Sequence, residues 1–260
     1  MGSTVSFLLL LFLSTINHIS SESIIKLPSD NDISGGNRKV RADDNVVCDS
    51  WRLAAETNNA GAWNGVPARC VKFVAEYLTG ERYRSDSEVI GKLASEFAKR
   101  VRLEGEGRDA WVFDIDETLL SNLPYYQDNG FGSVTFNETS FDDWVNVAEA
   151  PALAASLSLY KELQELGFKI FLLTGRSEHQ RNATEANLLF AGYSNWERLI
   201  LRGSSDQGKS ATLYKSEKRA ELVEEGYTIH GSSGDQWSDL WGYAVASRSF
   251  KLPNPMYYIP

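Results

Sequence analysis

Two carboxylates stand close together at Asp114 and Asp116, directly after the short apolar run Trp111–Phe113. Carboxylates at this spacing repel each other, so the pair favours either a bound cation or a raised pKa on one member. A hard, oxygen-rich site of this kind is typical of Mg²⁺. One carboxylate can then attack a phosphate ester while the other acts as general acid and base. The pair therefore predicts Asp114 as nucleophile and Asp116 as proton donor.

Further polar groups follow later apolar runs or lie on a predicted helix. They are Thr174, Gly175, Arg176, Lys215, Asp235 and Asp239. Asp114 and Asp235 offer hard oxygen ligands to Mg²⁺, and Asp116 can add its backbone carbonyl. The Thr174 hydroxyl and the backbone at Gly175 would donate to phosphoryl oxygens, and Lys215 would balance the charge of the transition state.

Some of these assignments have competitors in the sequence. Lys209 and Lys218 lie close enough to Lys215 to take its place. Asp239 either orients Lys215, sits in the outer shell of the metal, or is a plain solvated acid. Arg176 either binds substrate or lies on the surface.

The elements that must position these groups alternate along the chain. The predicted strands are 111–113, 168–173, 199–201 and 227–230, and the predicted helices are 151–166, 179–190 and 212–225. Strands expected to be buried on both faces, alternating with helices, predict an α/β fold with a doubly wound parallel sheet. Active sites in such sheets lie beyond the carboxyl ends of the strands, where all the candidate groups fall.

The flanking segments are expected to complete this sheet. Residues 48–103 predict N-terminal helices, one of them capped by Ser85 or Asp86. Tyr243–Ala246 predicts the closing strand, with Phe250 as a further candidate.

A small insertion, residues 119–150, follows the first core strand and is rich in aromatic side chains. They are Tyr125, Tyr126, Phe131, Phe136, Phe141 and Trp144. They predict either a rim over the site that stacks on an aromatic leaving group or an ordinary packed loop. Trp51 and Trp63 are expected in the core, and His179 and His230 are expected to be structural.

The motifs Asp114-Ile115-Asp116-Glu117-Thr118, Leu172-Leu173-Thr174-Gly175-Arg176, a helical Lys215 and Gly234-Asp235-Gln236-Trp237-Ser238-Asp239 resemble, in order, the four motifs of the haloacid dehalogenase superfamily. Cys48-Asp49-Ser50-Trp51, Tyr214-Lys215-Ser216 and Phe250-Lys251-Leu252-Pro253-Asn254-Pro255 are similar to the plant acid phosphatase and vegetative storage protein family. The resemblance covers roughly residues 46–260. Some storage members of that family lack the nucleophile, whereas Asp114 is present here, so the resemblance implies an active phosphatase.

The first residues predict the secretory route. Phe7–Leu13 is an apolar run too short for a membrane span, and a Ser-rich stretch follows it. We expect a signal peptide at 1–21, a flexible arm at 22–45 and the phosphatase domain at 46–260. The natural compartment is then extracellular or vacuolar.

The remaining sequence signals agree with that route. Cys48 and Cys70 are the only two cysteines, and in a secreted chain they predict one disulfide. Asn137 and Asn182 each begin a glycosylation sequon.

The sequence as a whole predicts a secreted, Mg²⁺-dependent acid phosphatase that acts on small phosphate monoesters. The formal net charge of −9 argues against a nucleic-acid partner, and no membrane association is expected after signal cleavage. A storage glycoprotein on the same scaffold and a phosphotransferase remain as alternatives. A homodimer is an open expectation.

Overall fold

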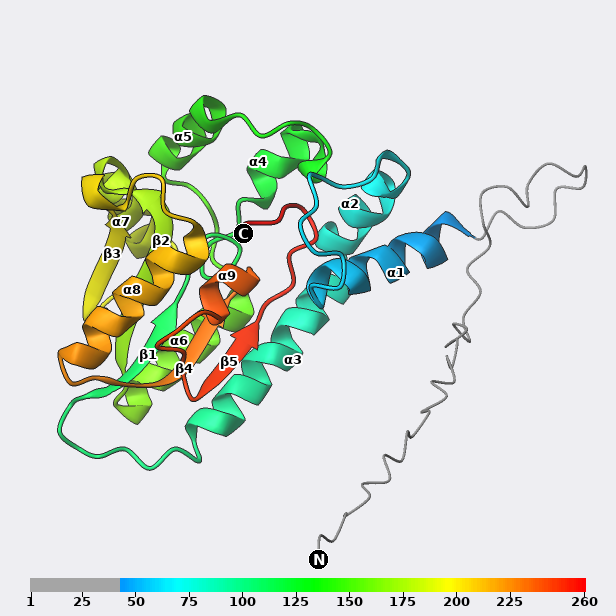
Figure 1. The fold of residues 1–260 in the computed structure, drawn as a ribbon. Helices are drawn as coiled ribbons and strands as arrows, with labels where there is room; N and C mark the ends of the chain where they lie inside the picture. Colours follow the sequence, from blue (N-terminus) through cyan, green and yellow to red (C-terminus); the bar gives the residue numbers. More distant parts are fainter. Residues whose placement is uncertain (1–42) are drawn as a thin grey trace, which may run out of the picture. The chain divides into compact units, whose positions relative to one another are not determined.

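The computed structural model describes residues 43–260 (Figure 1). The α-helices are α1 Asp44–Glu56, α2 Val71–Thr79, α3 Glu81–Ala98, α4 Leu123–Asp128, α5 Glu138–Val147, α6 Ala154–Leu166, α7 Arg181–Phe190, α8 Ala211–Glu224 and α9 Trp237–Leu240. The strands are β1 Asp109–Phe113, β2 Lys169–Ser177, β3 Arg198–Arg202, β4 Thr228–Gly234 and β5 Arg248–Lys251. Short 3-10 turns are η2 Ala68–Cys70, η3 Gly130–Gly132, η4 Glu178–Gln180 and η5 Ser204–Asp206.

The five strands form one sheet in the order β3-β2-β1-β4-β5, and every neighbouring pair is parallel. The chain therefore runs from the central strand β1 to one edge, and then returns to build the other half from β4. This arrangement confirms the predicted doubly wound α/β fold. The reversal of strand order lies between β1 and β4, which is where such sheets bind their ligands.

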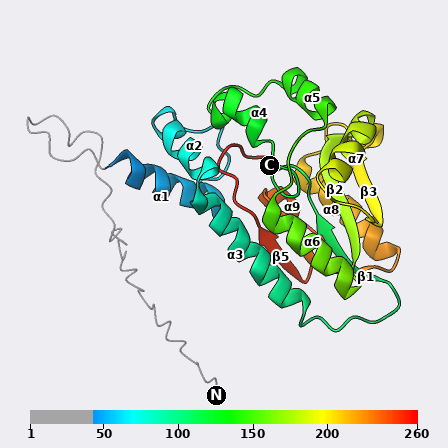
Figure 2. The ribbon, with the colours of Figure 1, turned by 180° about the vertical axis from the view of Figure 1, so that it is seen from behind.

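Helices cover both faces of the sheet because successive strand residues point to opposite sides. On one face, Trp111 and Phe113 of β1 pack in a core that includes residues of α3, α6 and α7. On the other face, Val112 packs with Tyr214 and Leu222 of α8. Figure 1 shows α8 on the near side of the sheet. Figure 2, which is the view from behind, shows α3 and α6 on the near side of the sheet.

A second apolar core joins the N-terminal helices to the insertion and the chain end. It contains the Cys48–Cys70 disulfide, which confirms the predicted bridge and fastens α1 to the start of α2. Tyr126 of α4 and Met256 near the C terminus pack in the same core. The insertion is thereby fixed above the carboxyl edge of the sheet, close to the C terminus (Figure 1).

Two local predictions are wrong. Helix α3 begins at Glu81, with Gly80 as its N-cap, so neither Ser85 nor Asp86 caps it. The closing strand is β5, which pairs with β4, and Tyr243–Ala246 is not a strand.

The guanidinium of Arg219 explains the second error. It donates to the backbone carbonyls of Tyr243 and Ala244, and also to those of Asp239 and Trp241. Those carbonyls are therefore satisfied without strand pairing.

The predicted signal peptide lies outside the described residues, as does the predicted arm up to Ala42. Asp44 and Asn45, at the end of that arm, already belong to α1. Among residues 43–260, none of the helices combines the length and the apolar character that crossing a bilayer requires.

Candidate active site

Asp114 is the first residue after β1, at the centre of the carboxyl edge. Its backbone N–H donates to the carbonyl of Ser233 in β4 at 2.9 Å, so the pairing of the two strands continues to the tip. The side chain is buried, and its Oδ1 accepts a hydrogen bond from Lys215 Nζ at 2.5 Å. The predicted nucleophile is therefore fixed by the central strand and by one cation.

Lys215 reaches the site from α8, one turn after the helix begins. Ser210 caps that helix by accepting from the backbone N–H of Leu213 at 3.2 Å. The competing Lys209 pairs with Asp206 and Glu217, away from the nucleophile. The structure therefore places Lys215 on Asp114.

Lys218, the remaining competitor, pairs with Glu221. Lys215 holds a second carboxylate as well, because its Nζ lies 2.5 Å from Oδ1 of Asp239. Oδ2 of Asp239 accepts from the backbone N–H of Gln236 at 2.8 Å. Asp239 therefore orients Lys215, which is one of the three roles expected for it.

Gly234 makes room for this arrangement. A Cβ on Gly234 would lie 2.4 Å from the Cβ of Asp239, far closer than two carbon atoms can approach. The glycine before Asp235 is therefore needed for α9 to turn back onto the end of β4.

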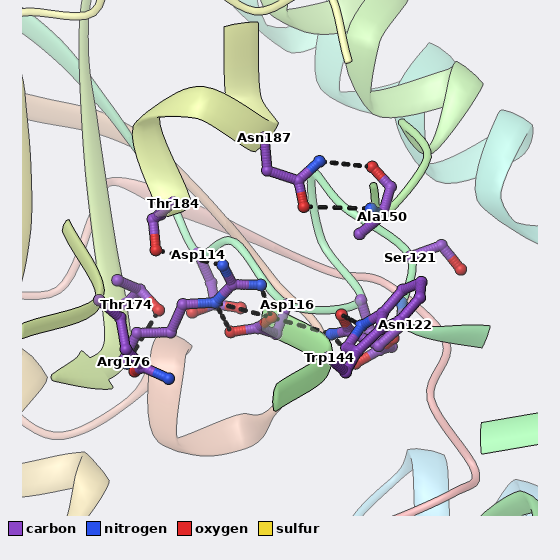
Figure 3. Close-up of polar contacts among 12 residues, drawn as sticks. Asp114, Asp116, Ser121, Asn122, Trp144, Ala150, Thr174, Arg176, Thr184 and Asn187 are labelled. Carbon is purple, nitrogen blue, oxygen red and sulfur yellow. Dashed lines mark hydrogen bonds and ion pairs between the residues drawn. The ribbon is translucent and has the colours of Figure 1, made fainter. Parts of the chain in front are cut away.

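Asp116 has a different environment from Asp114. Arg176 donates to Asp116 from Nη2 at 2.7 Å and from Nε at 3.1 Å, and Asn122 Nδ2 donates at 2.8 Å (Figure 3). On its other side, the Arg176 guanidinium donates to the Thr184 hydroxyl at 3.1 Å. The structure thus brings Arg176 to Asp116, the predicted proton donor, and a substrate contact for Arg176 stays a prediction.

The electrostatics of the two carboxylates diverge. Burial raises the pKa of Asp114 well above its usual range; the charge of Lys215 opposes this rise, and the charges of Asp239 and Asp235 add to it. Burial would also raise the pKa of Asp116, but the charge and hydrogen bonds of Arg176 outweigh it and hold that pKa below its usual value.

The site carries more negative than positive charge. Asp114, Asp116, Asp235 and Asp239 oppose two cations, Lys215 and Arg176, so full ionisation leaves a formal charge of −2. Carboxylate oxygens of Asp114, Asp235 and Asp239 lie within 4.8 Å of one another. Burial, followed by the charges of Asp239 and Glu117, raises the pKa of Asp235 to about 7. This set of hard ligands fits a divalent cation, which would neutralise the excess charge.

The groups expected to bind phosphate lie at the end of β2. Thr174 is fully buried, and its Oγ1 accepts from the backbone N–H of Arg176 at 3.1 Å. Gly175 is exposed and lines the same pocket as Asp114. Their predicted roles as phosphate ligands are compatible with these positions and stay predictions.

The pocket above the carboxylates has a volume of about 550 Å³. The insertion contributes Tyr125, Tyr126, Phe136 and Phe141 to its lining. These four side chains form a rim over the site, and their stacking on a leaving group stays a prediction. Trp144 belongs to the packed part of the insertion, because it packs against both cores and donates from Nε1 to Asn122 at 2.8 Å.

Residues outside the insertion also differ in position. Trp63 lines the pocket, contrary to its predicted core position, and packs edge-to-face on Trp51 at 5.3 Å. His179 lines the pocket, whereas His230 pairs with Asp109 at 2.8 Å near the start of β1.

Several residues of the site were given no role by the sequence analysis. Glu117 is buried, adopts a left-handed backbone conformation, and accepts from Asn122 N at 2.6 Å and from the Tyr257 hydroxyl. Burial, followed by the charge of Asp116, raises the pKa of Glu117 to about 7. Asn187 joins α7 to the end of the insertion by accepting from Ala150 N and donating to Ala150 O (Figure 3).

The chain resembles known proteins along most of its length. The model of the family described as HAD superfamily, subfamily IIIB (Acid phosphatase) matches residues 36–260. Acid phosphatase 1 from Solanum lycopersicum is 54% identical over 83% of this chain and 85% of that protein. Vegetative storage protein 1 from Arabidopsis thaliana is 36% identical over 97% of each. The class C acid phosphatase from Bacillus anthracis aligns with a TM-score of 0.60 and 25% identity, over 72% of this chain and 85% of that one.

Proposed function

Since the chain belongs to subfamily IIIB of the HAD superfamily, the acid phosphatases, we propose that it hydrolyses small phosphate monoesters through an aspartyl-phosphate on Asp114, with Mg²⁺ as cofactor. The observation that carries the proposal is the buried Asp114 at the tip of the central strand, held by Lys215 beside Asp235 and Asp239. The predicted signal peptide and the two sequons support assigning this activity to the secretory route.

Asp114 supplies the nucleophile. Its Oδ1 is occupied by Lys215, so we assign attack on phosphorus to Oδ2. As the new P–O bond forms, the ester P–O bond breaks and Asp116 gives its proton to the leaving oxygen. Water then attacks the phosphorus of the aspartyl-phosphate, and Asp116 takes the water proton. Phosphate leaves and Asp114 is restored.

Arg176 sets the condition under which Asp116 acts as an acid. Because Arg176 holds the pKa of Asp116 below its usual value, Asp116 gains a proton more often as the medium becomes more acidic. Esters with poor leaving groups depend on that proton. We therefore expect turnover of such esters to rise toward acidic pH, where more Asp116 carries a proton.

The metal site is assigned to this chain's own carboxylates. Asp114 and Asp235 would hold Mg²⁺, together with the backbone carbonyl of Asp116. When bound, the ion neutralises the phosphoryl group and the nucleophile together, so that two anions can meet. With or without the ion, the positive charge of Lys215 pairs with both Asp114 and Asp239 and reduces the repulsion between the two carboxylates.

Storage is a second candidate function, favoured by the similarity to a vegetative storage protein over almost the whole chain. The complete set of Asp114, Asp116, Lys215 and Asp235 supports catalysis over storage alone. Transfer of phosphate to an alcohol proceeds through the same aspartyl-phosphate and differs only in the acceptor.

The decisive test uses purified, secreted protein with nitrophenyl phosphate, an alkyl phosphate and an alcohol acceptor, with chelator and with Mg²⁺. We expect turnover to require the metal, and acid-quenched protein to carry phosphate on Asp114. The Asp114→Asn variant should lose several orders of magnitude, while the exposed Asp128→Asn serves as the matched control. Turnover above about a tenth of wild type in folded Asp114→Asn, a barrier change below about 1.4 kcal/mol, would refute the mechanism.

A further inference from the structure

The last nine residues of the chain, Leu252–Pro260, end at the active site. We call this segment the C-terminal tail. It begins where β5 ends, and Leu252 N donates to Gly234 O at 2.9 Å, directly before Asp235. The tail then packs in the second core through Leu252 and Met256, and its later residues Tyr257, Tyr258 and Ile259 line the pocket.

Asn254 is the residue of the tail that touches the catalytic carboxylates. It is 4% exposed, and its Nδ2 donates to Oδ2 of Asp235 at 2.7 Å. Its other side-chain atom, Oδ1, accepts from Met256 N at 2.9 Å. One amide therefore both turns the tail and holds Asp235.

Gln236 forms the other half of the same arrangement. Its Nε2 donates to Oδ2 of Asp235 at 2.7 Å and approaches the carbonyl of Tyr257 at 3.3 Å. Its Oε1 accepts from Ile259 N at 3.0 Å. Asp235 and the tail are thus joined twice, once through Asn254 and once through Gln236.

These contacts have a clear chemical meaning. Two neutral amides occupy the same oxygen of Asp235 without cancelling its charge, so they fix its orientation while it remains a ligand. Residues that orient metal ligands in this way typically change metal affinity when they are removed. Pro253 and Pro255 flank Asn254 and restrict the backbone on either side, which lowers the entropy lost when the tail is ordered.

We propose that Asn254 is a positioning residue for the metal-binding carboxylate of Asp235, so that the C-terminal tail is a working part of the active site. The inference rests on the proposed function, because it assigns Asp235 to Mg²⁺. It goes beyond that function by assigning a role to the Leu252–Asn254 sequence, which the reaction itself does not use.

Asn254→Ser isolates the proposed contact. The serine oxygen can still accept from Met256 N, as such residues do in turns, but it is too short to reach Asp235. Asn195→Ser is the matched control for Mg²⁺ affinity and turnover, because Asn195 is exposed on the loop before β3, at the opposite end of the strands. Its unfolding temperature is not compared, because its left-handed backbone (φ 59°) favours Asn over Ser. Gln236→Met is the second variant, which removes the other amide from Asp235.

Mg²⁺ binding to the full mature chain is measured by titration calorimetry, beside turnover over a range of Mg²⁺ concentrations and a thermal unfolding scan. We expect Asn254→Ser to bind Mg²⁺ about 10- to 100-fold more weakly, with the Mg²⁺ concentration for half-maximal turnover raised in proportion. The kcat at saturating Mg²⁺ should change far less. Gln236→Met should shift the affinity in the same direction, and Asn195→Ser should match wild type.

The outcomes separate this inference from the proposed function. Mg²⁺ affinity within about twofold of wild type in the folded variants, far below the shift expected for a lost orienting group, would overturn the role of Asn254 while wild-type activity stands. A lowered unfolding temperature with unchanged Mg²⁺ affinity would likewise overturn it, because it shows a purely structural residue. A wild-type chain that neither binds Mg²⁺ nor needs it would overturn both.

Discussion

Asp235 makes the metal-free protein less stable as the pH rises. Burial and the nearby charges of Asp239 and Glu117 raise its pKa from 3.8 to about 7 in the folded state. Between these values the folded protein keeps a proton that the unfolded chain has released. The stabilisation is therefore complete below about pH 4 and is lost as the pH rises through about 7. At about 1.4 kcal/mol per pH unit, the loss reaches about 4 kcal/mol at most.

The Asp235→Asn variant removes this titration and keeps the shape of the side chain. In the presence of a chelator, we expect the variant to be more stable than wild type at pH 8, by up to about 4 kcal/mol, and nearly equal to it at pH 4. Urea unfolding at several pH values measures the difference directly. Subtracting the two proteins at each pH isolates the titration of Asp235 together with its charge interactions with Asp114 and Glu117, and the exposed Asp128→Asn controls for loss of a carboxylate.

Mg²⁺ should narrow this difference at pH 8 and favour wild type at pH 4, where the two metal-free proteins are nearly equal. At a concentration of about 100 times its Kd, a ligand that binds the folded state adds about 2.7 kcal/mol to wild type. The variant lacks the Asp235 ligand and should gain much less, although it was the more stable protein without metal. A difference in unfolding free energy that stays constant from pH 4 to pH 8 would contradict the assigned electrostatics.

Three further outcomes test other parts of the structure. Asp116→Asn should slow hydrolysis of an alkyl phosphate by about 10²- to 10⁴-fold and affect nitrophenyl phosphate far less, and equal losses would refute its role as proton donor. Thr184→Ala removes the hydroxyl that holds the arginine paired with Asp116, so it should lower turnover, whereas Asn182→Gln removes the same sequon and should not. Similar turnover in the two variants, compared after deglycosylation, would contradict that link. Replacing Cys48 and Cys70 together by alanine should lower the unfolding free energy by about 3 kcal/mol in denaturant titrations, and an unchanged midpoint would argue against a stabilising bridge.

The central part of the site follows from the sequence because it depends on local order. Asp114, Thr174 and Asp235 each come after a predicted strand, and parallel strands bring such positions to one edge whatever the details of packing. The position of Lys215 is predicted in the same way, because Lys215 lies near the start of the helix that precedes β4. The sequence therefore predicts the fold and the residues that meet at the sheet edge.

The supporting contacts do not follow from the sequence, because they join residues far apart in the chain. Thr118 reaches Asp235, Arg176 reaches Asp116 and Tyr257 reaches Glu117, and nothing local marks these partners. Asn254 lies in the Phe250–Pro255 motif, which carries a family resemblance but does not indicate a contact with Asp235. Tyr243–Ala246 shows the opposite error. Its apolar pattern predicts a strand, but the guanidinium of Arg219, which is distant in sequence, donates to the carbonyls of Tyr243 and Ala244.

The position of the chain end also bears on how the protein is made. Synthesis runs from the N terminus, so β1 and the nucleophile emerge long before the tail that holds Asp235. A growing chain can assemble most of the sheet and still lack a fixed Asp235 carboxylate until residues 252–260 have been made. Any segment joined after Ile259 and Pro260, such as a purification tag, would begin beside the wall of the pocket.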